Sequence, residues 1–136
     1  MIKILIIGGG AMGSAFAIPC IENKNKVTIT EPYSKTFIKN LSSKKKFHSA
    51  LKINLPKKLI FKKYSNQLLK ENFDLIVIAL SLSGIDFIGK ELKNLKVKTP
   101  ILILTKGIKY ENSECTKKLR SLEREIKRSA QTPWFE

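Results

Sequence analysis

The feature that most constrains the fold is a glycine turn directly after an apolar run at the start of the chain. Lys3–Ile7 is rich in isoleucine and ends at residues 8–13, which have the sequence GGGAMG. A continuous β-branched run of this length is typical of a strand buried on both faces of a parallel sheet. An apolar segment of helical length, Ala11–Glu22, follows at once. This order predicts a strand, a tight turn and a helix.

The glycines match the pattern G-x-G-x-x-G through Gly8, Gly10 and Gly13. Gly8 permits the tight turn, Gly10 allows the backbone to approach a pyrophosphate, and Gly13 lets the helix press against the sheet. Free N–H groups in the first helical turn, which includes Ala11 and Met12, then receive the anion. The pattern therefore indicates a dinucleotide site, and the alternative is a glycine turn that binds no ligand.

An acidic residue supports the dinucleotide interpretation. Glu31 follows a second predicted strand, Lys26–Thr30, and lies 23 residues after Gly8. A carboxylate at that place accepts hydrogen bonds from the adenosine ribose and repels a 2′-phosphate, which favours NAD and leaves NADP as the alternative. Glu31 can also be read as an exposed carboxylate in the turn before Pro32.

The rest of the chain alternates apolar runs with helical patterns. Runs at residues 74–80 and 100–105 indicate two further buried strands, and residues 59–61 a weaker one. Helical patterns are predicted at residues 33–41, 66–72, 84–95 and 113–129. This alternation predicts an α/β fold with a Rossmann-type doubly wound parallel sheet. Pro19 conflicts with its predicted helix, which should kink or end early there.

Charge and composition narrow the function classes. The 136 residues contain 26 Lys plus Arg against 11 Asp plus Glu, a net charge of +15. The lysines are scattered without interleaved aromatic residues, so nucleic acid is not the expected partner. No apolar run is long enough to cross a bilayer, and we expect a cytoplasmic protein without membrane insertion. Cys20 and Cys115 lack metal-ligand spacing, so no metal site is expected.

Several motifs together resemble one enzyme family. The glycine loop with Ser14 and Ala15, the pair at residues 55–56, the run at residues 74–81 and the segment TKGI at residues 105–108 occur in this order. In this order they resemble the N-terminal NAD-binding domain of bacterial NAD(P)-dependent glycerol-3-phosphate dehydrogenase. The resemblance runs from about residue 1 to about residue 110, and residues 105–108 are its most specific part.

The resemblance implies an oxidoreductase that interconverts dihydroxyacetone phosphate and sn-glycerol 3-phosphate by hydride transfer in glycerophospholipid metabolism. It implies that Ser81 lies near the cofactor and that Lys106, with Gly107, contacts the small phosphorylated substrate. Lys106 also follows a predicted strand, where open α/β sheets bind ligands. Leu80 departs from the family pattern, which usually has proline at this position.

The resemblance assigns the family's catalytic base to a helical C-terminal domain that has no counterpart here, so no catalytic residue is predicted. We expect a dinucleotide-binding domain at residues 1–111 and a basic helical tail at residues 112–136, truncated or divergent. A homodimer and a missing second domain are both open. The alternatives are a 3-hydroxy-acid or ketopantoate-type dehydrogenase, and a non-catalytic dinucleotide- or polyanion-binding module.

Overall fold

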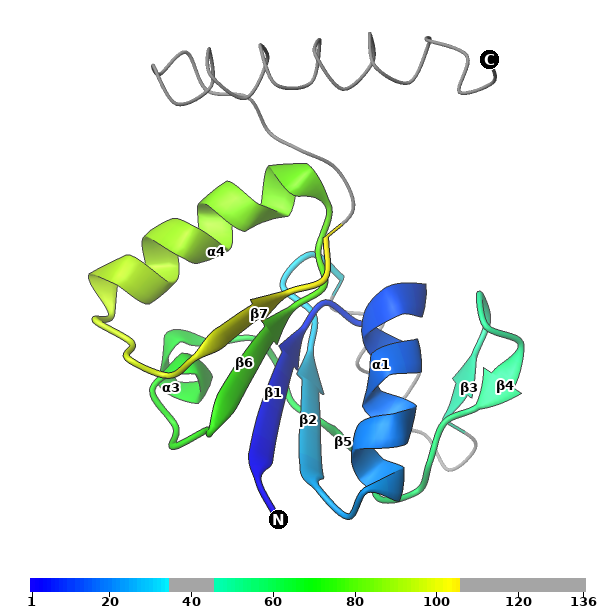
Figure 1. Cartoon of the computed structure of the whole chain (residues 1–136). Coiled ribbons are helices and arrows are strands. Elements are labelled where there is room, and N and C mark those ends of the chain that lie inside the picture. The colour runs from blue at the N-terminus through cyan, green and yellow to red at the C-terminus, as the bar shows by residue number, and fades with distance from the viewer. Residues whose placement is uncertain (35–45, 106–136) are drawn as a thin grey trace, which may run out of the picture. The chain divides into compact units, whose positions relative to one another are not determined.

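The computed structural model describes residues 1–34 and 46–105, which belong to one compact unit, Met1–Lys106. Its centre is a five-stranded sheet in the order β5-β2-β1-β6-β7, in which every neighbouring pair is parallel (Figure 1). The strands are β1 (Lys3–Ile7), β2 (Lys26–Thr30), β5 (Ile60–Phe61), β6 (Leu75–Ile78) and β7 (Ile101–Ile103). The predicted doubly wound parallel sheet is confirmed.

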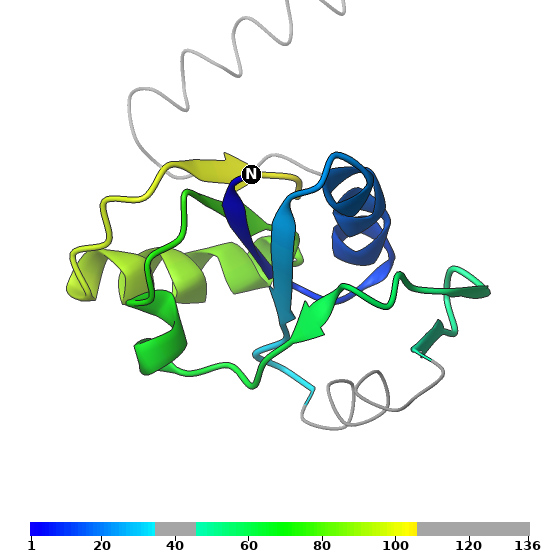
Figure 2. The same cartoon turned by 90° about the horizontal axis from the view of Figure 1, so that it is seen from below.

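Helices cover both faces of this sheet. Helix α1 (Ala11–Glu22) packs on one face, and the short α3 (Asn66–Leu69) and α4 (Leu82–Asn94) pack on the other (Figure 2). Because successive side chains of a strand point to opposite faces, β1 supplies Ile4 and Ile6 to the core under α1 and Leu5 and Ile7 to the core under α4. All four are buried, which explains the unbroken apolar run of β1.

The structure corrects several element predictions. The run at residues 100–105 was predicted to be a buried strand, but Ile101, Leu102 and Ile103 of β7 are all exposed in the described structure. Among the strands of the described residues, β7 pairs with β6 alone and lies at the end of the sheet. A short antiparallel hairpin, β3 (Phe47–His48) and β4 (Ile53–Asn54), was not predicted at all.

Helix boundaries also differ from expectation. The helix expected at residues 33–41 does not begin at Tyr33, which lies in a bend, and residues 35–45 are outside the described residues. Helix α1 does not end early at Pro19 but continues to Glu22. Helix α1 begins at Ala11, so the helix N-terminus predicted directly after the glycine turn is present. In the described part of the chain, no helix combines the length and apolar character needed to cross a membrane.

Candidate functional site

The glycine loop connects the carboxyl end of β1 to the start of α1. Gly8 has a φ of 114°, in the region that favours glycine, and its N–H donates a 2.8 Å hydrogen bond to the carbonyl oxygen of Thr30. A Cβ atom at Gly8 would lie 2.7 Å from the carbonyl carbon of Ala79 and 3.1 Å from Leu80 Cδ2. Gly8 therefore serves the turn and also the close contact between the ends of β1 and β6.

Gly13 allows α1 to approach its own loop. A Cβ atom there would overlap the carbonyl oxygen of Gly8 and would lie 3.2 Å from Ala79 Cβ. Gly13 is buried in the first turns of α1. The prediction that Gly13 permits close packing of the helix is confirmed. At Gly13, α1 packs closely against the glycine loop and the end of β6.

Gly10 differs from these two glycines because nothing in the described structure requires it. Its φ of −64° and ψ of −173° are accessible to other residues, and an added Cβ atom would meet no atom within 4 Å. Packing and backbone strain therefore do not explain a glycine here. Open space in front of the backbone fits a ligand that contacts the loop closely, as a pyrophosphate does in the G-x-G-x-x-G pattern.

The N-terminus of α1 is suited to an anion. Gly10 is the N-cap residue and provides no side-chain cap, and the first turn has no acidic residue. The first intrahelical hydrogen bond runs from Ser14 N–H to the Gly10 carbonyl oxygen at 3.0 Å, so the preceding N–H groups have no intrahelical acceptor. Ala11 and Met12 are exposed. These N–H groups and the helix dipole together attract negative charge.

Glu31 lies against the glycine loop, as the sequence pattern requires. Its Oε2 accepts a hydrogen bond from Gly9 N–H at 2.9 Å, and its Oε1 accepts one from Tyr33 N–H at 3.0 Å. A carboxylate has about four acceptor positions, so these two bonds leave others for ribose hydroxyls. The carboxylate is therefore held by two backbone groups at the edge of the loop.

His48 belongs to the same cluster, and sequence reasoning missed it. Its Nε2 lies 3.0 Å from the carbonyl oxygen of Gly9, which also accepts a 2.9 Å hydrogen bond from Ser14 Oγ. The residue is in β3, a two-residue strand of the unpredicted hairpin. A lone histidine in a lysine-rich segment has no local signal that places it beside a loop 39 residues earlier.

Other predicted residues lie at the same edge of the sheet or outside the described residues. Ser81 is exposed at the N-cap of α4, directly after Leu80, and its Oγ lies 3.0 Å from Ser83 Oγ. Thr105 Oγ1 donates a 2.8 Å hydrogen bond to the Leu80 carbonyl oxygen, which ties the ends of β6 and β7 together. The predicted substrate residues Lys106 and Gly107 lie outside the described residues, as does Cys115.

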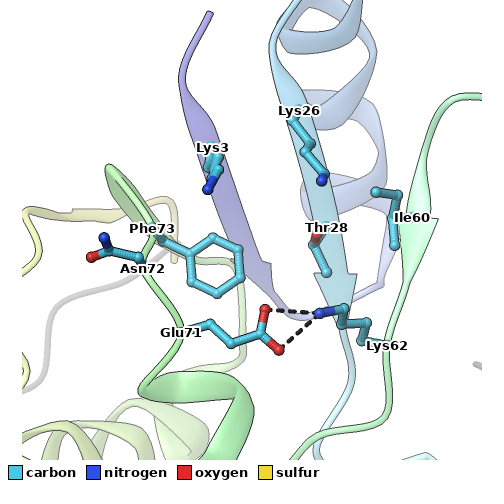
Figure 3. Close-up of a pocket in the computed structure, with 8 residues that line it drawn as sticks. All are labelled: Lys3, Lys26, Thr28, Ile60, Lys62, Glu71, Asn72 and Phe73. Atoms are coloured by element: carbon cyan, nitrogen blue, oxygen red, sulfur yellow. Dashed lines mark hydrogen bonds and ion pairs between the residues drawn. The ribbon is translucent and has the colours of Figure 1, made fainter.

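A separate cavity of about 280 Å³ lies along β1, β2 and β5, beside residues 71–73 (Figure 3). Lys3 and Lys26, the first residues of β1 and β2, line one end of it, and Lys62 forms a 2.8 Å ion pair with Glu71 at the other end. Ligands of open α/β sheets bind outside the carboxyl ends of the strands, and these two lysines lie at the amino ends. Within residues 1–34 and 46–105, no group of three or more His, Cys, Asp or Glu side chains could hold a metal ion.

A family model and a curated relative both identify the same enzyme family for this chain. The family model described as NAD-dependent glycerol-3-phosphate dehydrogenase N-terminus matches residues 3–132. The match continues well past Glu111, where the motif-based resemblance was expected to end. A protein of Archaeoglobus fulgidus named NADP(+)-dependent glycerol-3-phosphate dehydrogenase is 32% identical over 118 residues, which cover 83% of this chain and 34% of that protein. The chain thus spans about a third of the length of this curated relative.

Solved structures share the fold. Glycerol-3-phosphate dehydrogenase from Coxiella burnetii superposes with a TM-score of 0.66 at 20% identity, covering 90% of this chain and 37% of that one. A putative 2-dehydropantoate 2-reductase from Enterococcus faecalis gives a TM-score of 0.58 at 24% identity, covering 79% and 34%. At such identities the likeness establishes the fold alone.

Proposed function

Because this chain belongs to the family of NAD-dependent glycerol-3-phosphate dehydrogenase N-terminal domains, we propose that it binds NAD or NADP at the glycine loop. The observation that carries this proposal is the open space at Gly10. Two of the three motif glycines are needed by the protein's own packing, whereas a side chain at Gly10 would contact nothing within 4 Å. A ligand that must approach the backbone closely gives a physical reason for a glycine there.

The chain's own groups have distinct parts in this binding. The N–H groups at the start of α1, from Gly10 through Ala11 and Met12, hold the pyrophosphate by hydrogen bonds and by the helix dipole. Glu31 accepts hydrogen bonds from ribose hydroxyls while its backbone partners fix its position. Ser81, at the carboxyl edge beside Leu80, offers a hydroxyl to the cofactor. The bound dinucleotide supplies or accepts the hydride.

We propose further that the reaction served is the interconversion of dihydroxyacetone phosphate and sn-glycerol 3-phosphate, in the cytoplasm. Lys106 and Gly107 are proposed to contact the substrate, because a lysine ammonium holds a phosphate or polarises a carbonyl. The general base is expected in the helical C-terminal domain implied by the family resemblance. With the base expected there, residues 1–136 alone should turn over substrate slowly or not at all.

The test combines binding and turnover on the purified chain. Titration with NADH and NADPH, followed by nucleotide fluorescence, should give saturable binding of both, with NADH bound more tightly. An assay with NADH and dihydroxyacetone phosphate should give little activity. Absence of saturable binding would refute the dinucleotide proposal, and turnover comparable with a full-length family enzyme would refute the need for a second domain.

A second candidate function, polyanion binding, is favoured by the net charge of +15. Salt separates it from the first. A protein held to nucleic acid by lysine–phosphate contacts loses affinity steeply as salt rises, because bound counterions are released. NADH held by backbone N–H groups should lose much less. Parallel titrations with duplex DNA and NADH at two salt concentrations decide which ligand the chain binds specifically.

A further inference from the structure

The carbonyl oxygen of Gly9 accepts hydrogen bonds from two side chains of different elements. Ser14 Oγ of α1 lies 2.9 Å away and His48 Nε2 of β3 lies 3.0 Å away. Both residues are buried, with exposed fractions of 0% and 4%. Ser14 directly follows the glycine motif in α1, whereas His48 comes from the β3–β4 hairpin, 39 residues after Gly9.

The hydrogen bonds of His48 define which ring nitrogen carries the proton. Leu51 N–H donates to Nδ1 at 3.2 Å, so Nδ1 is an acceptor and carries no proton. A neutral imidazole then has its proton on Nε2, which donates to the Gly9 carbonyl oxygen. The turn between β3 and β4 thus holds the ring in the one tautomer that can bond to the loop.

Anchoring this carbonyl determines where the next N–H points. The peptide bond between Gly9 and Gly10 is planar and trans, so its C=O and its N–H point in opposite directions. The Gly9 oxygen is directed to buried donors, and Gly9 itself is buried while Gly10 is exposed. The Gly10 N–H is therefore directed outward, toward the open space that the proposed function assigns to the pyrophosphate.

We propose that His48 is a positioning residue for dinucleotide binding: by donating to the Gly9 carbonyl oxygen, it holds the Gly9–Gly10 peptide in the orientation that presents the Gly10 N–H to the ligand. This inference rests on the proposed function and adds to it a residue outside the glycine motif. It also gives the β3–β4 hairpin a role, because the hairpin carries the ring to the loop and holds it there through Leu51.

Two conservative substitutions separate the two hydrogen bonds of His48. In His48→Gln, the amide nitrogen reaches the place of Nε2 and keeps the donation to Gly9. In His48→Asn, the shorter side chain keeps an acceptor near the place of Nδ1 for Leu51 N–H but leaves the Gly9 oxygen without this donor. We expect His48→Asn to raise the Kd for NADH about fivefold, the effect of one lost hydrogen bond, and His48→Gln to change it less than about twofold.

Controls distinguish positioning from simple stability. Thermal unfolding of each variant without nucleotide shows whether a change in Kd arises from a misplaced loop or merely from a less stable domain. Ser14→Ala, which removes the other donor to the same oxygen, should raise the Kd by a similar factor and serves if a His48 variant fails to fold. Equal NADH affinity of the wild type, His48→Asn and Ser14→Ala would overturn the role of His48 while leaving dinucleotide binding intact. A wild-type chain that binds no NADH would overturn both.

Discussion

Three glycine-to-alanine substitutions, identical in chemistry, should separate packing from ligand binding. Gly13→Ala is the packing case. Its methyl group would overlap the Gly8 carbonyl oxygen and lie 3.2 Å from Ala79 Cβ. Gly8 cannot easily move away, because its φ is 114° and its N–H is bonded to Thr30. Overpacking against backbone should cost about 3 kcal/mol, the upper part of the usual range. In a domain of this size that lowers Tm by about 12–24 °C.

Gly10→Ala is the ligand-binding case. The added methyl group meets nothing within 4 Å, so the cost to the fold is that of alanine at a helix N-cap, below about 1 kcal/mol. The same methyl group would occupy the space proposed for the pyrophosphate. Losing one charge-assisted hydrogen bond there, worth about 1.5–3 kcal/mol, should raise the Kd for NADH about 10- to 150-fold.

Gly89→Ala provides the matched control. Gly89 lies exposed in α4, and a Cβ atom there also meets nothing within 4 Å. Alanine should stabilise this helix by about 0.5–1 kcal/mol and leave nucleotide affinity unchanged. Tm is measured by circular dichroism and Kd by NADH fluorescence. The reasoning is refuted if Gly10→Ala binds NADH as the wild type does, or if Gly13→Ala unfolds at the wild-type temperature.

The remaining predictions concern charge and burial. Glu31→Gln removes the charge that repels a 2′-phosphate, so the NADPH affinity relative to NADH should rise about tenfold in paired titrations, equivalent to about 1.4 kcal/mol; Glu22→Gln, which removes an exposed charge at the end of α1 away from the glycine loop, should leave the ratio unchanged. Burial, with smaller contributions from Glu91 and Tyr33, raises the pKa of the Tyr64 hydroxyl from 10.0 to about 12. The folded state therefore favours the neutral hydroxyl, and this stabilisation is complete below pH 10 and lost as the pH rises toward 12. Tyr64→Phe should reduce the loss of stability in that pH range and cost nothing at neutral pH, because the hydroxyl has no hydrogen-bond partner in the described structure; urea unfolding that shows a destabilised variant at neutral pH would contradict this.

The local patterns near the N-terminus were sufficient to predict the first strand, turn and helix. The strand β1 is buried on both faces, so its sequence is apolar at every position from Ile4 to Ile7. The roles predicted for Gly8 and Gly13 agree with the structure, because a side chain at either position would clash with neighbouring atoms and only glycine avoids the clash. Glu31 could be placed beside the loop because strand length and crossover geometry fix where the second parallel strand ends.

Predictions failed where an element's surroundings decide its state. Residues 101–103 have the composition of a buried strand, yet their side chains are exposed in the described part of the chain, where β7 lies at the end of the sheet. An apolar composition shows that a segment can be buried, but it does not show whether other helices or strands pack over that segment in the fold. The β3–β4 hairpin was missed because two-residue strands carry no detectable alternation.

The order of residues along this chain was enough to predict a parallel α/β sheet and a glycine turn between its first strand and helix, since both follow from steric limits and periodicities that act over a few residues. Which glycine the packing leaves free, and which side chains hold the loop, emerged only from the folded structure. Gly10 stands out because its neighbours in space are absent, and His48 because a hairpin brings it back across 39 residues to the Gly9 carbonyl oxygen. Such contacts join residues that are far apart in the sequence, so they cannot be predicted from a short segment of it.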